Sequence, residues 1–232
     1  MKSLKGATMA PHNIKWKSAP RGAARKKVAI VCAGLSGYDA PLDDPTWEVW
    51  GLNGCDKYLW NARGEFRADR WFEIHDLDEA VCKRRRPKGF RAWLKQLPCP
   101  LYQLHGRKDN AKSLQFPLDR VIEFGRDYFG CTMAYQVGLA LVEGFKTIGL
   151  FGAELNYGRE ALAERPTVEW WLGFAQGLGV KVVIPKYYFG LGNHPHRYAS
   201  DQVLEREAVF EFCANHLQTN ALYIASRAKG LA

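Results

Sequence analysis

No stretch of the sequence is apolar over the roughly 18 to 20 residues that a membrane-spanning helix needs. The N-terminus is basic and lacks the apolar segment of a secretory signal peptide. Because neither feature is present, we expect a soluble protein of the cytoplasm.

Paired cysteines are also missing. The six cysteines are widely separated, and none belongs to a C-x-x-C pair. This spacing argues against a disulfide framework and against a zinc knuckle. We expect reduced thiols in the core instead, since free cysteine is among the most buried residue types.

Acidic residues are absent from the first 27 positions. This segment holds eight lysine and arginine residues, so it carries +8 of the chain's net charge of +9. It is rich in Gly, Pro, Ser and Ala and shows little hydrophobic periodicity, which predicts a disordered basic arm over residues 1–27. We expect this arm, with Lys26 and Lys27 at its end, to be attracted to polyanions.

A second basic group lies further along the chain, beside Phe90 and Trp93. Its members are Lys83, Arg84, Arg85, Arg86, Lys88, Arg91 and Lys95. Lysine and arginine supply most of the nonspecific affinity for nucleic acid by neutralising phosphates. The two groups predict a DNA-binding surface made by Lys26, Lys27, Arg84, Arg85, Arg86 and Lys88. A solubilising tail and a solvated helix face would explain the same charges.

Short apolar runs bounded by turn residues predict the β-strands. They lie at 28–33, 47–53, 70–75, 100–105, 146–151 and 180–185. Helical spacing occurs at 90–97, 131–144 and 167–178, and again over 200–228. Two consecutive helix–strand units require right-handed parallel crossovers. We therefore predict an α/β fold with a Rossmann-like, mostly parallel sheet of about six strands and helices on both faces. Residues 28–232 are expected to form one domain that ends in a helical segment.

Ligands of open α/β sheets bind beyond the carboxyl ends of the strands, so the residues at those ends are the candidate site. The first strand ends in Gly34-Leu35-Ser36-Gly37, whose small residues would let backbone N–H groups approach a phosphate. A plain strand-to-helix turn explains the same glycines. The second strand ends in Asn53, whose amide could contact a base or a sugar, or could simply form a turn.

The third strand ends in the densest group of ionisable residues, Glu73-Ile74-His75-Asp76-Leu77-Asp78. Strand alternation places Glu73 and His75 on the same side, and His75 is our first candidate for a general base because imidazole titrates near neutrality. Asp76 and Asp78 are candidate ligands for Mg²⁺ or Mn²⁺ against a diphosphate, since hard cations prefer carboxylates. The same two acids could instead cap the next helix.

The penultimate strand is followed by Glu154, Asn156 and Tyr157. Glu154 could orient a sugar hydroxyl or remove its proton, which makes it the second candidate base. Gly130-Cys131-Thr132 opens the strongest predicted helix, and its free N–H groups and positive dipole end favour an anion.

Residues 130–157, GCTMAYQVGLALVEGFKTIGLFGAELNY, resemble the helix–strand segment of bacterial CMP-sialic-acid-dependent sialyltransferases. They are also similar to the methanopterin pyrophosphokinase-like domain. The earlier segments VAIVCAGLSG, WEVWGLN and RWFEIH resemble nucleotide-binding proteins encoded by phages. The resemblance implies a glycosyltransferase-like fold and a nucleotide-sugar donor.

The resemblance assigns roles to single residues of this chain. It implies that Gly34 and Ser36 lie at the nucleotide phosphate, Asn53 near the nucleoside or donor sugar, Thr132 at the helix start and Tyr157, preceded by Asn156, near the leaving phosphate. The sialyltransferases have Asp where this chain has Glu154. Their histidine before the last helix has no counterpart near Glu164 or Arg165, so the base is expected to be His75 or a carboxylate such as Glu154.

The resemblance and the basic segments lead to one preferred function. We expect a phage-type, nucleotide-sugar-dependent glycosyltransferase that modifies a hydroxymethylated pyrimidine in DNA, in the cytoplasm of the host cell. One alternative is a nucleotide-dependent pyrophosphokinase that uses Asp76 and Asp78 with magnesium. Another is a non-catalytic phage accessory protein that binds nucleotide or DNA. The oligomeric state is open.

Overall fold

The computed structural model describes residues 26–78, 86–155 and 158–185, with the side chains of 158–162 excepted. Its contacts divide the chain into two compact units, Met1–Asn193 and His194–Ala232, and every described residue belongs to the first. The expected disordered arm up to residue 25 and the expected C-terminal helical segment lie outside the described residues.

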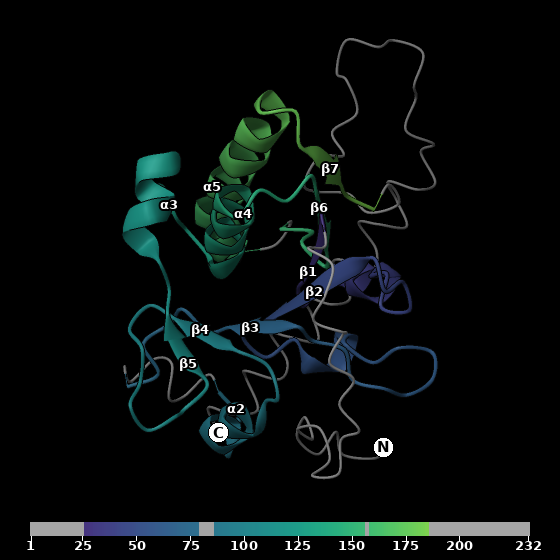
Figure 1. Ribbon diagram of the computed structural model, residues 1–232, viewed down its shortest axis with the longest axis vertical. Helices are drawn as coiled ribbons and strands as arrows, with labels where there is room; N and C mark the ends of the chain where they lie inside the picture. The colour runs from purple at the N-terminus through teal and green to yellow at the C-terminus, as the bar shows by residue number, and fades with distance from the viewer. Residues whose placement is uncertain (1–25, 79–85, 156–157, 186–232) are drawn as a thin grey trace. The chain divides into compact units, whose positions relative to one another are not determined.

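Seven strands form one sheet in the described part of the chain (Figure 1). They are β1 (Lys27–Val31), β2 (Trp47–Leu52), β3 (Arg70–Phe72), β4 (Leu101–Gln103), β5 (Ser113–Gln115), β6 (Thr147–Phe151) and β7 (Lys181–Val183). Their order is β5-β4-β3-β2-β1-β6-β7, and every neighbouring pair is parallel. The predicted α/β, Rossmann-like parallel sheet is confirmed, with one more strand than expected.

The strand order reverses between β1 and β6. From β1 the chain steps outward through β2 to β5 on one side, and it then returns to place β6 and β7 on the other side. The register pairs Val31 with both Gly51 and Phe151, so three loops leave the sheet at the same level. This reversal is the topological switch point at which such sheets bind ligands.

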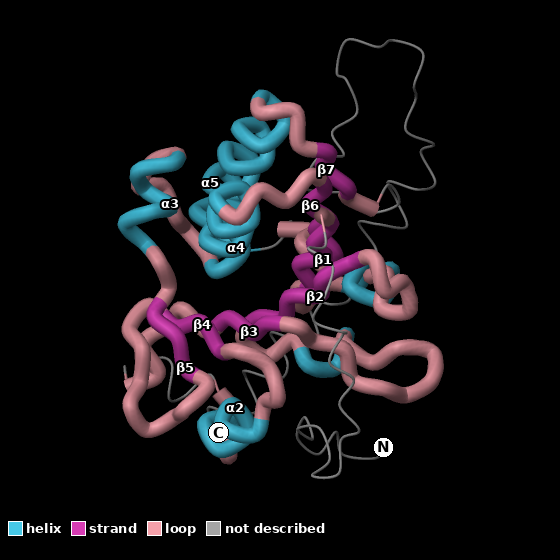
Figure 2. The backbone as a smooth tube through the Cα atoms, in the orientation of Figure 1, coloured by secondary structure: helices cyan, strands magenta, loops and turns pink. Residues whose placement is uncertain are grey.

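Helices cover both faces of the sheet (Figure 2). They are the short 3-10 helices η1 (Leu35–Asp39) and η2 (Asp56–Tyr58) and the α-helices α2 (Phe90–Gln96), α3 (Leu118–Phe124), α4 (Thr132–Val142) and α5 (Gly158–Gly177). Figure 1 shows α2 on one side of the sheet and α3, α4 and α5 on the other. None of the helices described is long and apolar enough to cross a membrane.

Strand alternation sends neighbouring aromatic side chains into the two layers. Trp71 packs edge-on against Trp93 of α2, with ring centroids 4.9 Å apart. The next residue, Phe72, faces the other layer, where it stacks on Tyr102 and contacts Trp50. The central strands β1 and β6 are buried along almost their whole length, as expected for parallel strands covered on both faces. The rigid core therefore ends at the carboxyl edge of β1, β2 and β6.

The basic arm ends earlier than residue 27. The carbonyl of Lys26 accepts hydrogen bonds from the backbone N–H groups of Lys146 and Thr147, and Lys27 is the first residue of β1. The ammonium of Lys27 donates to Thr46 and lies 5.6 Å from the centre of the Trp47 ring. Lys27 thus belongs to the sheet, and the backbone of Lys26 is bound to the start of β6.

Candidate functional site

The turn after β1 is tied to the turn after β6 at the switch point. Gly34 N donates to Gly152 O at 2.9 Å, and Gly152 N donates to the hydroxyl of Ser36 at 2.7 Å. Ser36 N donates to Oε1 of Glu154, also at 2.7 Å. Gly152 has a φ of 76°, which favours glycine. The two loops therefore form one hydrogen-bonded unit.

Glu154 braces this unit with its carboxylate. A Cβ atom on Gly34 would lie 1.4 Å from Oε2 of Glu154 and 2.7 Å from the carbonyl oxygen of Gly152. Gly34 is therefore required by close packing inside the protein. The N–H groups of Gly34 and Ser36, expected to meet a phosphate, both have internal acceptors. Because a Cβ atom at this position would clash with Glu154 and Gly152, Gly34→Val would disrupt the turn itself. A loss of nucleotide binding by that variant would therefore not show that Gly34 contacts the nucleotide.

Asn53 and Thr132 are brought together beside this unit, as the sequence suggested for two residues of one site. Asn53 follows β2 with a φ of 49°, and its backbone N–H donates to Phe72 O. The hydroxyl of Thr132 donates to Oδ1 of Asn53 at 3.3 Å. Thr132 is the first residue of the eleven-residue helix α4, so the positive end of the helix dipole lies here.

Gln136 continues this polar strip one turn further along α4. The residue is fully buried, and its amide nitrogen donates to Gly51 O at 3.4 Å. Its Oε1 has no hydrogen-bond partner among the described residues. A buried amide oxygen without a donor is costly, and the described part of the chain offers this one no compensating partner. Sequence reasoning missed Gln136 because it lies inside an apolar helical pattern.

The end of β3 carries a buried carboxylate that contacts two cationic or titratable side chains. Glu73 is fully buried, and Oε1 lies 2.8 Å from Nδ1 of His75. Nη2 of Arg86 lies 2.9 Å from both oxygens of Glu73 and 3.2 Å from Nδ1 of His75. The His75 side chain is 45% exposed, whereas Arg86 is 21% exposed. The fold therefore places a candidate base with its orienting carboxylate at the carboxyl edge.

Arg86 has a different environment from the one predicted for a DNA contact. Its guanidinium offsets the charge of Glu73 and lies 5.2 Å from the centre of the Phe90 ring. The pairing of Arg86 with Glu73 could not be predicted, because the two residues are 13 positions apart. In the sequence, Arg86 belongs to a run of basic residues that indicated a solvent-facing surface. Lys88 is exposed, and Arg84 and Arg85 lie outside the described residues.

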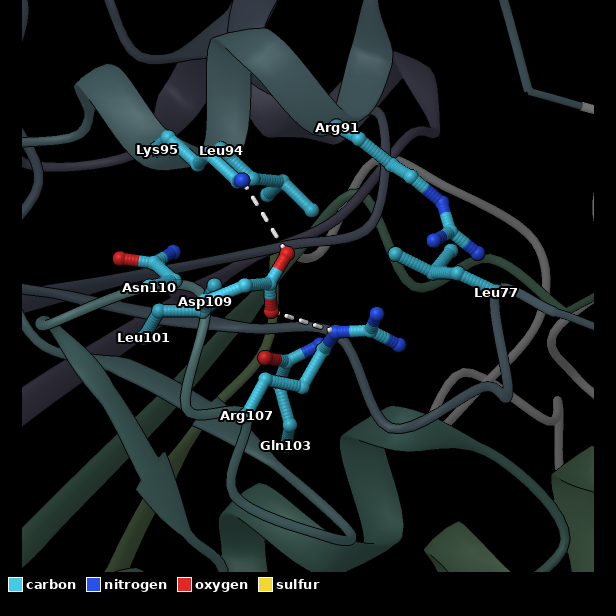
Figure 3. Close-up of a pocket in the computed structure, with 9 residues that line it drawn as sticks. All are labelled: Leu77, Arg91, Leu94, Lys95, Leu101, Gln103, Arg107, Asp109 and Asn110. Carbon is cyan, nitrogen blue, oxygen red and sulfur yellow. Dashed lines mark hydrogen bonds and ion pairs between the residues drawn. The ribbon is translucent and has the colours of Figure 1, made fainter.

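The basic side chains of α2 also have acidic partners. Arg91 contacts Asp78 at 2.6 Å, and Lys95 contacts Asp109 at 3.1 Å. Figure 3 shows the Asp109 carboxylate between Lys95 and Arg107. These pairs reduce the positive charge that this helix offers to a polyanion.

Asp76 and Asp78 make protein contacts where the sequence suggested a divalent cation. Asp76 accepts a hydrogen bond from the backbone N–H of Asp78 at 2.8 Å. Asp78 binds Arg107 and Arg91, and these hydrogen bonds lower its pKa to about 2. Within residues 26–78, 86–155 and 158–185, no group of three His, Cys, Asp or Glu side chains could hold a metal ion. Asp78 already binds two positively charged guanidinium groups, so it does not fit the role of a metal ligand.

The four cysteines in the described ranges are free thiols. Burial raises the pKa of Cys55 to about 12 and that of Cys131 to about 11, and it raises the pKa of Cys32 as well. These thiols stay protonated at neutral pH and are poor nucleophiles. Cys82 and Cys213 lie outside the described residues, as do the candidate donor-binding residues Asn156 and Tyr157.

A further hollow of about 370 Å³ opens at the carboxyl ends of β4 and β5. Leu104, Phe116 and Leu118 supply apolar walls, and His105 and Asp119 are polar lining residues. Sequence reasoning missed it because β5 was not predicted.

Comparison with known proteins finds limited similarity to solved structures. No protein-family model and no curated protein matches the chain. One matching solved structure is the sialyltransferase CstII from Campylobacter jejuni in complex with a substrate analogue, cytidine-5'-monophosphate. The two chains are 14% identical with a TM-score of 0.44, and the match covers 83% of this chain and 99% of that chain.

Proposed function

We propose that this chain is a nucleotide-sugar-dependent glycosyltransferase in which His75 is the general base. The observation that carries the proposal is the contact of 2.8 Å between the buried Glu73 carboxylate and Nδ1 of His75. Two groups compete for Nδ1: Glu73, which only accepts hydrogen bonds, and Arg86, which only donates them. The contact with Glu73 is the shorter, 2.8 Å against 3.2 Å, and it favours the tautomer with the proton on Nδ1. Nε2 is then unprotonated. Because the ring is partly exposed, Nε2 can take a proton from the hydroxyl of an acceptor substrate.

The proposed step balances as a nucleophilic substitution. The acceptor hydroxyl oxygen forms a bond to the anomeric carbon of the donor sugar, and the bond from that carbon to the nucleotide phosphate oxygen breaks. His75 takes the hydroxyl proton on Nε2, and the nucleotide leaves with the bonding electrons. A positioned base of this kind contributes about 10²- to 10⁴-fold in rate.

The donor nucleotide is proposed to lie at the start of α4. The positive dipole end of this eleven-residue helix would stabilise a leaving phosphate. Asn53 and Thr132 contact each other at this point, and the unpartnered Oε1 of Gln136 lies one turn along the same helix. Glu154 is not proposed as the base, because its carboxylate is bound to Ser36 N.

The acceptor is proposed to be the hydroxyl of a hydroxymethylated pyrimidine in DNA, modified by a phage-encoded enzyme. Support comes from the sequence, where residues 1–27 hold eight basic and no acidic residues. A target base inside a duplex must be flipped out, at a cost of a few kcal/mol. Asp78 is bound by two arginines, which does not fit the magnesium site that the pyrophosphokinase alternative needs.

The test is a transfer assay read by mass spectrometry. Hydroxymethylated DNA is incubated with the full-length protein and each of a panel of nucleotide sugars, with unmodified DNA as the control. The proposal expects a mass increase of one sugar residue on the hydroxymethylated base alone. Nucleotide binding without any product over the whole panel would favour a non-catalytic binding protein and would overturn the proposal.

A further inference from the structure

An exposed apolar surface lies directly beside the switch-point turn. We call it the shelf, and it consists of Leu35 and Tyr38 of η1 and Lys57 of η2. Leu35 is 66% exposed and Tyr38 is 67% exposed. Large apolar side chains are stabilised by leaving water, so both would gain from contact with a ligand.

The side chain of Tyr38 packs against Tyr58, which is held in place by a hydrogen bond. The ring of Tyr38 lies 4.7 Å from that of Tyr58, which is only 4% exposed. The hydroxyl of Tyr58 donates to the carbonyl of Ala33 at 2.6 Å. Ser36, within η1 itself, is bonded through its backbone N–H to Glu154. Tyr38 is therefore presented by a braced turn, which lowers the entropy cost of binding to its ring.

A cation lies over the buried Tyr58 ring, against which the exposed Tyr38 ring packs. Nζ of Lys57 lies 4.7 Å from the centre of the Tyr58 ring. A hydrogen bond to Tyr58 raises the pKa of Lys57, so its ammonium group stays charged at neutral pH. An exposed aromatic face with a neighbouring ammonium matches a nucleobase with its phosphate.

The shelf also borders the proposed catalytic groups. η2 follows the end of β2, where Asn53 lies, and its N-cap is Cys55. The backbone N–H of Asn53 donates to the carbonyl of Phe72, the residue before Glu73, so η2 and the His75 group follow neighbouring strand ends. A ring bound at Tyr38 would thus lie on the same edge of the sheet as the base.

We propose that the shelf binds an unpaired nucleobase by stacking on Tyr38, with the adjacent phosphate paired to Lys57. This surface would hold the acceptor strand, so the inference deepens the proposed function and rests on its nucleic-acid acceptor. The other large apolar side chains exposed in the described ranges, Leu114, Phe124 and Leu178, lie on separate elements. They provide matched controls.

The test is fluorescence anisotropy with a short, labelled, single-stranded oligothymidylate and the full-length protein, without any nucleotide sugar. We expect Tyr38→Ala to weaken binding by about tenfold or more, because base stacking on an aromatic side chain is worth that much. Tyr38→Phe keeps the ring and should bind as the wild type does. Lys57→Gln should flatten the slope of log K against log salt by about 0.7, the share of one phosphate contact on a single strand.

Phe124→Ala removes an aromatic side chain that is 43% exposed on α3, and it should leave binding unchanged. Unaltered binding by folded Tyr38→Ala, or no binding by the wild type, would overturn the inference. A change in sedimentation of Tyr38→Ala with unchanged oligonucleotide binding would instead assign the shelf to a second copy of this chain. Because the assay needs no donor, it stays informative if glycosyl transfer fails.

Discussion

Nδ1 of His75 lies 2.8 Å from a carboxylate oxygen of Glu73, which no solvent reaches. Burying a carboxylate costs several kcal/mol unless charged and hydrogen-bonding partners compensate. Arg86 supplies the compensating charge from the segment before α2. The His75 ring is thereby held by a group that neither solvent nor a surface side chain can displace.

Glu73→Gln should reduce kcat for transfer by at least about tenfold with little change in KM, because an amide no longer fixes the tautomer of His75. The variant also leaves Arg86 without its charged partner, which should cost about 3 to 5 kcal/mol of stability. The double variant Glu73→Gln/Arg86→Met removes both charges, and we expect it to regain stability in thermal unfolding without regaining kcat. Restored transfer in the double variant would show that Glu73 acts only through stability.

Glu154 should behave as a brace. Glu154→Gln keeps an oxygen that can accept from Ser36 N, so we expect nearly wild-type stability and transfer. Glu154→Ala leaves that N–H without its acceptor, and the loss should be about 1 to 3 kcal/mol in denaturant unfolding. If Glu154→Gln abolished transfer in a folded protein, the carboxylate would be chemically active and the brace assignment would be wrong.

The central strands were predictable because they are continuous apolar runs, buried on both faces. β5 was not predicted, since Ser113–Gln115 is a three-residue edge strand whose side chains are mostly exposed. The helix predicted from Thr167 begins instead at Gly158 and continues through Pro166. Proline normally stops a helix, but packing of this segment against α4 outweighs that preference.

Asp78 predicts a specific acid dependence. Its pKa in the folded protein is about 2 against an ordinary value of 3.8, because Arg107 and Arg91 favour the ionised form. The stabilising contribution is present above about pH 4 and is lost as the pH falls towards 2. In thermal unfolding, Asp78→Asn should be less stable than the wild type at pH 6, and the difference should shrink steadily as the pH falls from about 4 to 2.

High salt should reduce the difference in stability between the wild type and Asp78→Asn at pH 6. Arg91 and Arg107, the partners of Asp78, are partly exposed to solvent, so ions screen their charges. A stability difference as large at pH 2 as at pH 6 would mean that Asp78 stabilises the fold without its charge.

Removal of residues 2–25 tests the basic arm. The deletion has to stop at 25, because Lys26 and Lys27 pair with the strand region that begins at Lys146. We expect weaker DNA binding and a flatter slope of log K against log salt, by about 0.9 for each lost phosphate contact on a duplex. An unchanged slope would leave the arm as a solubilising tail.

The candidate site was only partly predictable for a physical reason. His75, Asn53 and Thr132 were found because polar residues at strand ends and helix starts gather at one edge of a parallel sheet. The partners were not predictable: the Glu73–Arg86 pair and the bond from Ser36 to Glu154 depend on where the connecting loops return. Residues 118 positions apart in the sequence meet only because the strand order reverses at β1.

The most direct test is the turnover of His75→Gln in the mass-spectrometric transfer assay, with Glu154→Gln measured alongside it. A general base at His75 predicts a loss of about 10²- to 10⁴-fold in kcat with donor affinity nearly unchanged, in a protein whose melting temperature stays close to that of the wild type. Wild-type turnover by a folded His75→Gln variant would contradict the account, and loss of turnover in Glu154→Gln alone would move the base to the switch-point turn.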